Sequence, residues 1–259
     1  MPARFRHLSF AICASALLLS AVGRAQQIAT TNTPSSIPTA PANAANSTLT
    51  SPTEAAQKMI TAAIQRMNAN DPDGALNDLS QAIKLNPNST GAYVLRASVY
   101  YQKKEWPQSE DDFKAAAQLA PTNVVVKFNL AELKFVQKEY DAARPGFIAL
   151  ESDPDMGDFA SYKVFLCDLF GGHEVAAKKE LDGFNDMMGN PSYYFANAAW
   201  SLFHKNIEDA RGWLISASRI YPLEKNDTYA QSLHDLGYLP IPGPNDKVIP
   251  PGAGNPSHP

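Results

Sequence analysis

The chain has 259 residues and a formal net charge of −4, from 26 acidic residues against 22 Lys and Arg. Residues 1–25 hold three of the arginines and no acid, so loss of this segment would shift the formal charge from −4 to −7. Because binding to phosphate backbones rests on clustered Lys and Arg, this acidic balance argues against a nucleic-acid partner.

Residues 1–25 have the layout of a cleavable secretory signal peptide. A basic lead precedes an uncharged apolar run over residues 10–22, and small residues flank Arg24 at the positions that a signal peptidase reads. We therefore predict cleavage after Ala25 and a secreted or periplasmic protein. The run is shorter than the roughly 20 residues that a membrane span requires, so no stable span is expected after cleavage. The alternatives are an uncleaved anchor and a chance apolar helix.

Two further segments have the composition of disordered chain. Residues 26–53 carry no charge and consist mainly of Thr, Ser, Ala, Asn and Pro, which cannot bury enough apolar surface to offset chain entropy. Residues 240–259 hold seven Pro and three Gly, which predicts an unpacked tail with polyproline II tendencies. The folded domain is therefore expected over residues 54–239, long enough for one substantial core.

The folded part opens on a helix signal and then repeats itself every 34 residues. Residues 51–54, SPTE, fit a capping box in which Ser is the cap and Pro is the first helical residue. Residues 77–87, NDLSQAIKLNP, align without a gap with residues 111–121, DDFKAAAQLAP. The same spacing continues through three more copies, the last of which follows after 33 residues. Each copy has a small residue followed four positions later by a large apolar one: Ala75 and Leu79, Ser109 and Phe113, Ala143 and Phe147, Ala177 and Leu181, and Ala210 and Leu214. A period in this range indicates a helical solenoid.

The fullest copy, residues 92–121, resembles the tetratricopeptide repeat. Aromatic, small and Pro residues stand where that family has them, at Tyr93, Ala97, Tyr100, Ser109, Phe113, Ala116 and Pro121. The resemblance covers about residues 56–222, and the fourth copy matches least well. It implies an all-α fold, a right-handed α-solenoid of about five tetratricopeptide-like helix hairpins plus a C-terminal capping helix.

Each copy should form two antiparallel helices that bury their apolar stripes only by stacking on neighbouring copies. We expect Pro87, Pro121 and Pro222 to end second helices, because proline cannot continue a helix. Pro145 falls about one turn inside a helix and should bend or delay it.

A final helix should follow the last copy. Tyr229, Leu233 and Leu236 lie at i, i+4 and i+7, Asp227 can cap the start, and Gly237 can end the helix. We expect this helix to cover the open end of the stack, as solenoids require.

The sequence offers little catalytic chemistry. It contains no Gly-rich phosphate loop, no G-x-S-x-G and no HExxH. Cys167 and His173 are close enough in sequence to suggest a thiol–imidazole dyad, but Phe165 and Leu166 place the cysteine on an apolar face. A buried, inert cysteine is therefore the favoured interpretation.

Metal binding is not favoured either. The histidines show no ligand spacing, and the acidic group Asp153, Asp155 and Asp158 lacks the ligand number of a calcium loop. Its Asp-Pro and Met-Gly pairs favour a turn between helices. We therefore predict no catalytic residue, no metal site and no cofactor, and a protein that is not an enzyme.

The resemblance also implies a binding surface, because in that family the first helices line a concave face that binds peptides or folded partners. The positions carried over are Val94, Ser98, Tyr101, Phe128, Glu132, Phe135, Tyr162, Leu166, Leu169, Phe195, Ala199 and Leu202. Most are apolar, so we expect no clamp for a C-terminal carboxylate, and a path for an amphipathic helix or extended segment instead. The alternatives are that these side chains are plain core, or that the final helix and the Pro-rich tail fill the groove.

Together these features predict a non-catalytic protein–protein interaction scaffold of the exported compartment, with a protein or peptide partner and residues 26–53 as a spacer. A second hypothesis is a cell-wall or glycan-binding module, which needs exposed Trp200 and Trp213 for sugar stacking. Trp200 looks like a core position, which counts against it. A third hypothesis is an enzyme that uses Cys167 or the acidic loop.

Overall fold

The computed structural model describes residues 51–187 and 189–239, and within these ranges the chain forms eleven α-helices, one 3-10 helix and no strand. The predicted all-α fold class is confirmed. The signal peptide predicted over 1–25, residues 26–50 of the predicted linker and the tail predicted over 240–259 lie outside the described residues. No helix among the described residues is long and apolar enough to cross a membrane. The described chain divides into two compact units, one ending at Lys127 and one beginning at Phe128.

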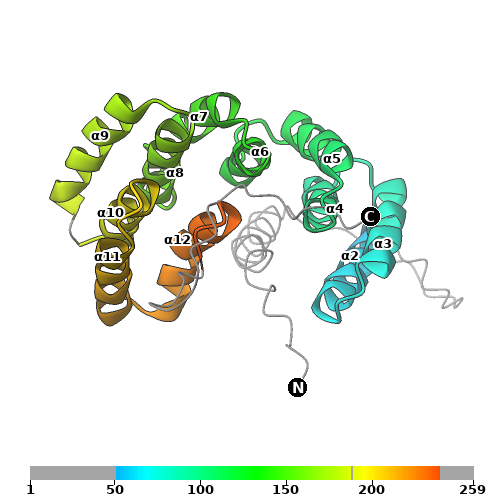
Figure 1. Ribbon diagram of the computed structural model, residues 1–259. Coiled ribbons are helices and arrows are strands. Elements are labelled where there is room, and N and C mark those ends of the chain that lie inside the picture. Colours follow the sequence, from blue (N-terminus) through cyan, green and yellow to red (C-terminus); the bar gives the residue numbers. More distant parts are fainter. Residues whose placement is uncertain (1–50, 188, 240–259) are drawn as a thin grey trace, which may run out of the picture. The chain divides into compact units, whose positions relative to one another are not determined.

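The first unit consists of two helix hairpins, α2 with α3 and α4 with α5 (Figure 1). The bounds are α2 (Pro52–Asn68), α3 (Pro72–Leu85), α4 (Thr90–Gln102) and α5 (Trp106–Leu119). Ser51 caps α2, since its Oγ accepts the N–H of Glu54 at 3.2 Å, which confirms the serine half of the predicted capping box. Asp71 and Ser89 cap α3 and α4 in the same way.

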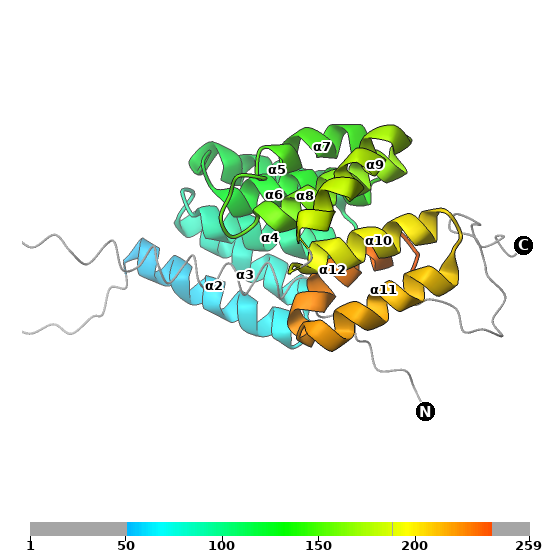
Figure 2. The same ribbon diagram turned by 90° about the vertical axis from the view of Figure 1, so that its left-hand side faces the viewer.

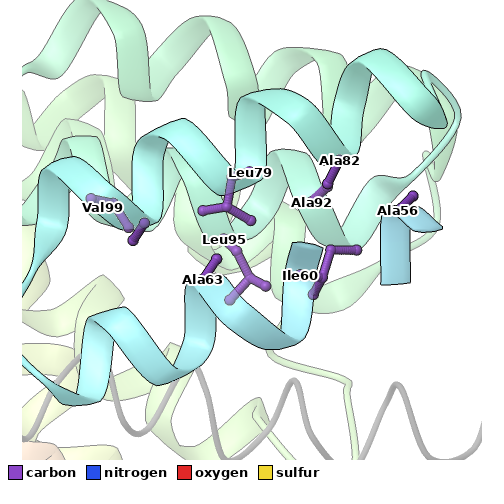
Figure 3. Packing of buried hydrophobic residues seen from close by; sticks show 9 residues of the cluster. Ala56, Ile60, Ala63, Leu79, Ala82, Ala92, Leu95 and Val99 are labelled. Carbon is purple, nitrogen blue, oxygen red and sulfur yellow. The ribbon is translucent and has the colours of Figure 1, made fainter. Parts of the chain in front are cut away.

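The core of the first unit joins three helices into one apolar cluster (Figure 3). Its buried members are Ala56, Ile60, Ala63, Ala75, Leu79, Ala82, Ala92, Leu95 and Val99. The alanines let the helix axes approach closely, and the larger side chains fill the space between them. Because the cluster includes residues of α4, the first hairpin buries its apolar face against the second, as stacked repeats require.

The turns between paired helices repeat one backbone conformation at the predicted period. The residues with positive φ in these turns are Asn70, Lys104, Lys138, Gly172 and Lys205. Successive turn residues are 34, 34, 34 and 33 positions apart, which is the same spacing that the side-chain pattern shows in the sequence. The fourth copy, which matches least well in sequence, thus has the same turn as the others.

Gly172 is the turn residue with the lowest conformational cost, and replacing it should destabilise the fold. A Cβ there would meet no neighbour within 4 Å, so the cost of Gly172→Ala comes from its φ of +88° alone. We expect a loss of about 1 kcal/mol in the free energy of unfolding. The matched control is Gly212→Ala in the interior of a helix, also with open space around it, which should gain about 1 kcal/mol from helix propensity. Urea unfolding of both variants checks the pair, and equal signs would contradict the turn assignment.

The second unit continues the pairing and ends in a single helix. Its elements are most of α6 (Val124–Val136), then α7 (Tyr140–Ile148), α8 (Gly157–Phe170), α9 (Glu174–Gly183), η1 (Phe184–Met187), α10 (Pro191–Phe203), α11 (Ile207–Ile220) and α12 (Leu223–Asp235). The pairs are α6 with α7, α8 with α9, and α10 with α11. The described residues thus contain the five predicted hairpins and one final helix.

The prolines act largely as predicted. Pro87 and Pro121 follow the ends of α3 and α5 by two residues. Pro145 does not break α7, but that helix has only nine residues. The next residue is Gly146, where a Cβ would lie 2.7 Å from the Cβ of Ala131 on α6. A side chain at this position would push α6 and α7 apart.

The final helix differs from its prediction at its start. Asp227 is not its cap; α12 begins at Leu223, with Pro222 in an extended conformation as the N-cap residue. Pro222 therefore both ends the preceding pair and starts α12. Helix α12 ends as predicted. Gly237 has φ +82°, and the N–H of Tyr238 donates to the carbonyl of Leu233 at 2.8 Å.

Candidate functional site

The predicted groove positions are mostly inside the fold. Ser98 and Tyr101 are half-buried, and the other ten are buried: Val94, Phe128, Glu132, Phe135, Tyr162, Leu166, Leu169, Phe195, Ala199 and Leu202. In the first unit Ser98 donates its hydroxyl to the carbonyl of Val94 at 2.8 Å. The twelve side chains therefore do not form an open apolar groove in the described structure, and their role in binding a partner stays a prediction.

In the second unit the covering element is α12. It lies against α10 in both views (Figure 1 and Figure 2). The ring of Tyr229 contacts aromatic rings of both α8 and α10. The ring centroid of Tyr229 lies 5.0 Å from Phe159, 5.2 Å from Tyr162 and 5.6 Å from Phe195. Since α8 and α10 are first helices of their pairs, α12 lies on the side where the sequence analysis predicts a binding surface, and not only at the end of the stack.

We call this surface the α12 face, defined by Glu132 of α6, Phe159, Tyr162 and Lys163 of α8, and Phe195 of α10. Its three aromatic rings all contact the ring of Tyr229. The hydroxyl of Tyr229 donates to Asn190 Oδ1 at 3.2 Å, and burial raises the pKa of Tyr229. Tyr229 is therefore held as a neutral aromatic anchor.

A buried ion pair completes the α12 face. The Nζ of Lys163, which is fully buried, lies 2.8 Å from Glu132 Oε2 and 3.4 Å from the ring centroid of Phe135. It also donates to Ser232 Oγ of α12 at 3.3 Å. Burial raises the pKa of the Glu132 carboxyl, and the charge of Lys163 only partly opposes this rise.

Two side chains of the α12 face keep unsatisfied polar capacity. Among the described residues, the Glu132 carboxylate is paired with the Lys163 ammonium at 2.8 Å and has no second donor. The hydroxyl of Tyr162 has no hydrogen-bond partner within the same ranges. Buried polar groups usually find partners, so α12 leaves these two groups of the face incompletely satisfied.

The geometry does not support thiol catalysis. Cys167 is buried, and burial raises its pKa to about 12, whereas a nucleophilic cysteine needs a lowered pKa and access. The Nε2 of His173 lies 2.9 Å from Asp141 Oδ1 in an exposed turn. We expect Cys167 to resist alkylation in the native protein and to react fully after denaturation. Labelling with iodoacetamide followed by mass spectrometry checks this, and rapid native labelling would contradict the burial.

The acidic segment forms a turn between α7 and α8, as predicted. Asp153 Oδ1 accepts the N–H groups of Asp155 at 3.1 Å and Met156 at 2.9 Å, which orders the turn. Within the described ranges no group of three or more His, Cys, Asp or Glu side chains could hold a metal ion.

The tryptophans of the glycan hypothesis are half-buried. The Trp200 ring lies 4.4 Å from the His204 ring, with Lys178 Nζ at 5.9 Å. Trp213 packs edge-on against Tyr193 at 5.5 Å. Trp200 is thus less buried than the sequence suggested, and protein side chains lie against both rings.

The sequence analysis missed a recurring Arg–carboxylate pair. Asp78 and Asp112, 34 residues apart and on second helices, are buried; they meet Arg66 at 2.7 Å and Arg96 at 2.7 and 2.8 Å. Glu180 is at the same repeat position in the fourth copy. In the third copy the position falls on Gly146, whose contact with α6 excludes a side chain. The 34-residue spacing of these acids is the signal that could have revealed them.

In the fourth copy the pair becomes a cluster. Arg144 donates to both oxygens of Asp168 at 2.7 and 2.8 Å and to Glu180 at 3.3 Å. Burial, with the hydrogen bond and charge of Asp168, raises the pKa of Glu180 to about 8. The raised pKa favours the protonated form of the Glu180 carboxyl in the folded protein.

Comparison with known proteins identifies the repeat. Residues 60–124 match the family model described as tetratricopeptide repeat. The chain is 32% identical over 94 residues, 35% of its length, to Bacteriophage adsorption protein A of Escherichia coli (strain K12), and 31% identical over 81 residues, 31% of its length, to DnaJ protein P58IPK homolog A of Oryza sativa subsp. japonica. These matches span only 9% and 17% of the two relatives.

Solved structures share the fold at low identity. PilF of Pseudomonas aeruginosa matches with a TM-score of 0.53 at 18% identity, over 73% of this chain and 93% of that one. MamA of Desulfovibrio magneticus RS-1 matches with a TM-score of 0.54 at 12% identity, over 64% of this chain and 95% of that one. At these identities the likeness establishes the fold alone.

Proposed function

Because this chain carries tetratricopeptide repeats, which imply a protein–protein interaction scaffold, we propose that it binds a helical segment of a partner protein on the α12 face. The observation that supports the proposal is that a helix, α12, already occupies this face through one aromatic anchor. A surface that holds one amphipathic helix has the shape and apolar lining to hold another. The scaffold is non-catalytic in this proposal, and the energy of binding comes from a few aromatic contacts.

The burial of the groove residues determines how the proposal is tested. Charged substitutions at Phe128 or Phe195 would disrupt packing and report on folding rather than on binding. A photoreactive phenylalanine analogue at Phe159 preserves the ring at the edge of the α12 face, where the side chain retains 9% exposure. The matched control carries the same analogue at Val175 on α9, which is 89% exposed.

We expect specific crosslinked partners in cells from position 159 and none of the same species from position 175. Identical products at both positions, or products at position 175 alone, would show that the α12 face is not the binding surface.

The proposal places the scaffold in an exported compartment. The support is the sequence layout of residues 1–25. Mass spectrometry of the protein recovered from its host should give a mature N-terminus at Gln26. A recovered chain that retains residues 1–25 would contradict the export part and leave the binding part untouched.

A further inference from the structure

Four half-buried aromatic rings lie together in the second unit, near the turns between its paired helices. They belong to Tyr140 at the start of α7, Phe170 at the end of α8, Phe203 at the end of α10 and Tyr238 just beyond α12. The ring centroid of Phe170 lies 6.3 Å from that of Tyr140, 5.7 Å from Phe203 and 5.4 Å from Tyr238. We call these four rings the aromatic edge. Each of them retains exposed surface, so the aromatic edge is open to a further contact.

The aromatic edge borders a pocket of about 460 Å³ between the third and fourth hairpins. Two of its acids already have partners, since Glu139 lies 3.2 Å from Lys134 Nζ and Asp141 lies 2.9 Å from His173 Nε2. What the pocket offers to an occupant is therefore mainly aromatic surface. Its lining consists of residues 138–142, Phe170 and Gly171.

The chain leaves the described fold beside this pocket. Gly237, with φ +82°, turns the backbone after α12, and the ring of Tyr238 then packs against Phe170. Leu239 is followed by residues 240–244, PIPGP, which hold three prolines and no charge. The first residues of the tail thus begin one ring contact away from a pocket that Phe170 lines.

The chemistry of residues 240–244 suits an aromatic pocket. Proline-rich segments favour polyproline II, and because this conformation is largely preformed they dock in aromatic-lined grooves at low entropic cost. Polyproline II has three residues per turn, so Ile241 and Pro244 share one face. An extended segment of five residues covers roughly 15 Å. That length exceeds the two ring-to-ring steps of 5.4 Å and 6.3 Å that lead from Tyr238 through Phe170 to Tyr140.

We propose that residues 240–244 dock as a polyproline II segment in the pocket beside the aromatic edge, with Ile241 and Pro244 against the rings of Phe170 and Tyr140. The occupant is the chain's own tail, because its attachment at Leu239 holds it near the pocket at an effective concentration of roughly millimolar. The docked tail acts as a strap that fixes the C-terminal end of α12. The aromatic edge shares no residue with the α12 face, so this docking does not require a partner there.

Photocrosslinking within the full chain tests the docking. A photoreactive phenylalanine analogue replaces Asn245, which directly follows the docked segment and contributes no contact of its own. After irradiation of the dilute protein, we expect crosslinks within one chain to residues 138–142 or to residues 170–171. Mass spectrometry of the digested monomer identifies the crosslinked peptides.

Two sets of substitutions separate docking from mere tethering. Changing Pro240, Pro242 and Pro244 to Gly keeps the tether length but removes the proline rings and the polyproline II preference, so the crosslink yield should fall at least fivefold. The matched control changes the three prolines at positions 250, 251 and 256 to Gly and should leave the yield unchanged. Equal yields in the two triple variants would show that tethering alone produces the crosslink, and would overturn the proposal.

Single substitutions test which face of the tail is docked. Ile241→Ser should lower the crosslink yield at least threefold, whereas Gly243→Ser, on another face of a polyproline II segment, should not. The reverse order would overturn the assigned contacts.

The position of the crosslinks tests the occupant. Crosslinks that join two chains would show that the pocket takes the tail of a second copy, and crosslinks spread over other helices would show that the tail has no fixed site; either result overturns the proposal. The proposed function is judged separately by the crosslinking at position 159, since the two analogues lie on different surfaces.

Discussion

Replacing Lys163 by Met should lower the free energy of unfolding of the second unit by about 3–5 kcal/mol at pH 7. The change keeps the apolar stem but removes the charge that lies 2.8 Å from Glu132, so a buried carboxylate loses its counter-ion. It also removes the contact of the ammonium with the ring of Phe135. Urea unfolding followed by circular dichroism measures the loss.

The double variant Lys163→Met with Glu132→Leu is the decisive comparison. Since replacing both members of a buried pair by apolar residues is often neutral or stabilising, we expect it to recover most of the lost stability. The single variant should be less destabilised at pH 5 than at pH 7, because burial raises the pKa of Glu132, loss of the Lys163 charge removes what opposes that rise, and acid favours the neutral carboxyl. A single variant as stable as the unmodified chain, at every pH, would show that Lys163 is not buried against Glu132.

Glu180 should make the second unit less stable as pH rises. Its pKa is about 8 in the folded state, against roughly 4.3 in an unfolded chain. Between these values the folded state binds one more proton than the unfolded state, so the free energy of unfolding falls with rising pH and is highest below the unfolded value. The charged groups around Glu180 are Asp168, Arg144 and Glu151.

The coupling of Glu180 to Asp168 and the partial exposure of Glu180 reduce this effect. We therefore expect the free energy of unfolding to fall by about 2 kcal/mol between pH 5 and pH 8. Glu180→Gln imitates the protonated form and should remove most of this slope, while the exposed control Glu224→Gln should leave it unchanged. The ion pair of His204 with Glu174 also stabilises the fold less as pH rises, because the pKa of His204 is raised. This contribution is the same in the unmodified chain and in both variants. If the free energy of unfolding of Glu180→Gln still fell with rising pH to the same extent, Glu180 would not be the source of the pH dependence.

The repeat could be predicted because its cause is local and periodic. Small and large residues recur at 34 positions, and the same spacing reappears in the positive-φ turns from Asn70 to Lys205. The positive-φ lysines at these turns could not be predicted from the sequence, because Gly or Asn is the usual residue in this conformation. The Gly146 contact with Ala131 was also hidden, because it depends on the distance between two helices.

The arrangement of α12 could not be predicted from its own pattern. Tyr229, Leu233 and Leu236 show that a helix has an apolar side, but not which helices it will contact. Lys163 was the available clue: it is a lone cation within the apolar helix α8, and such a residue requires a partner such as Glu132. The start of α12 at Leu223 rather than at an Asp227 cap likewise depends on the Pro222 turn.

The most direct test of the account is hydrogen exchange of the full chain under native conditions, comparing backbone amides of residues 226–235 with those of α8. If a partner helix can take the place of α12 on the α12 face, as the proposed function requires, the amides of α12 will exchange through a local opening of lower free energy than the unfolding that exposes α8, and Tyr229→Ala will speed exchange in α12 far more than in α8. If the amides of α12 exchange only together with those of α8, the helix is a permanent part of the core and the account is contradicted.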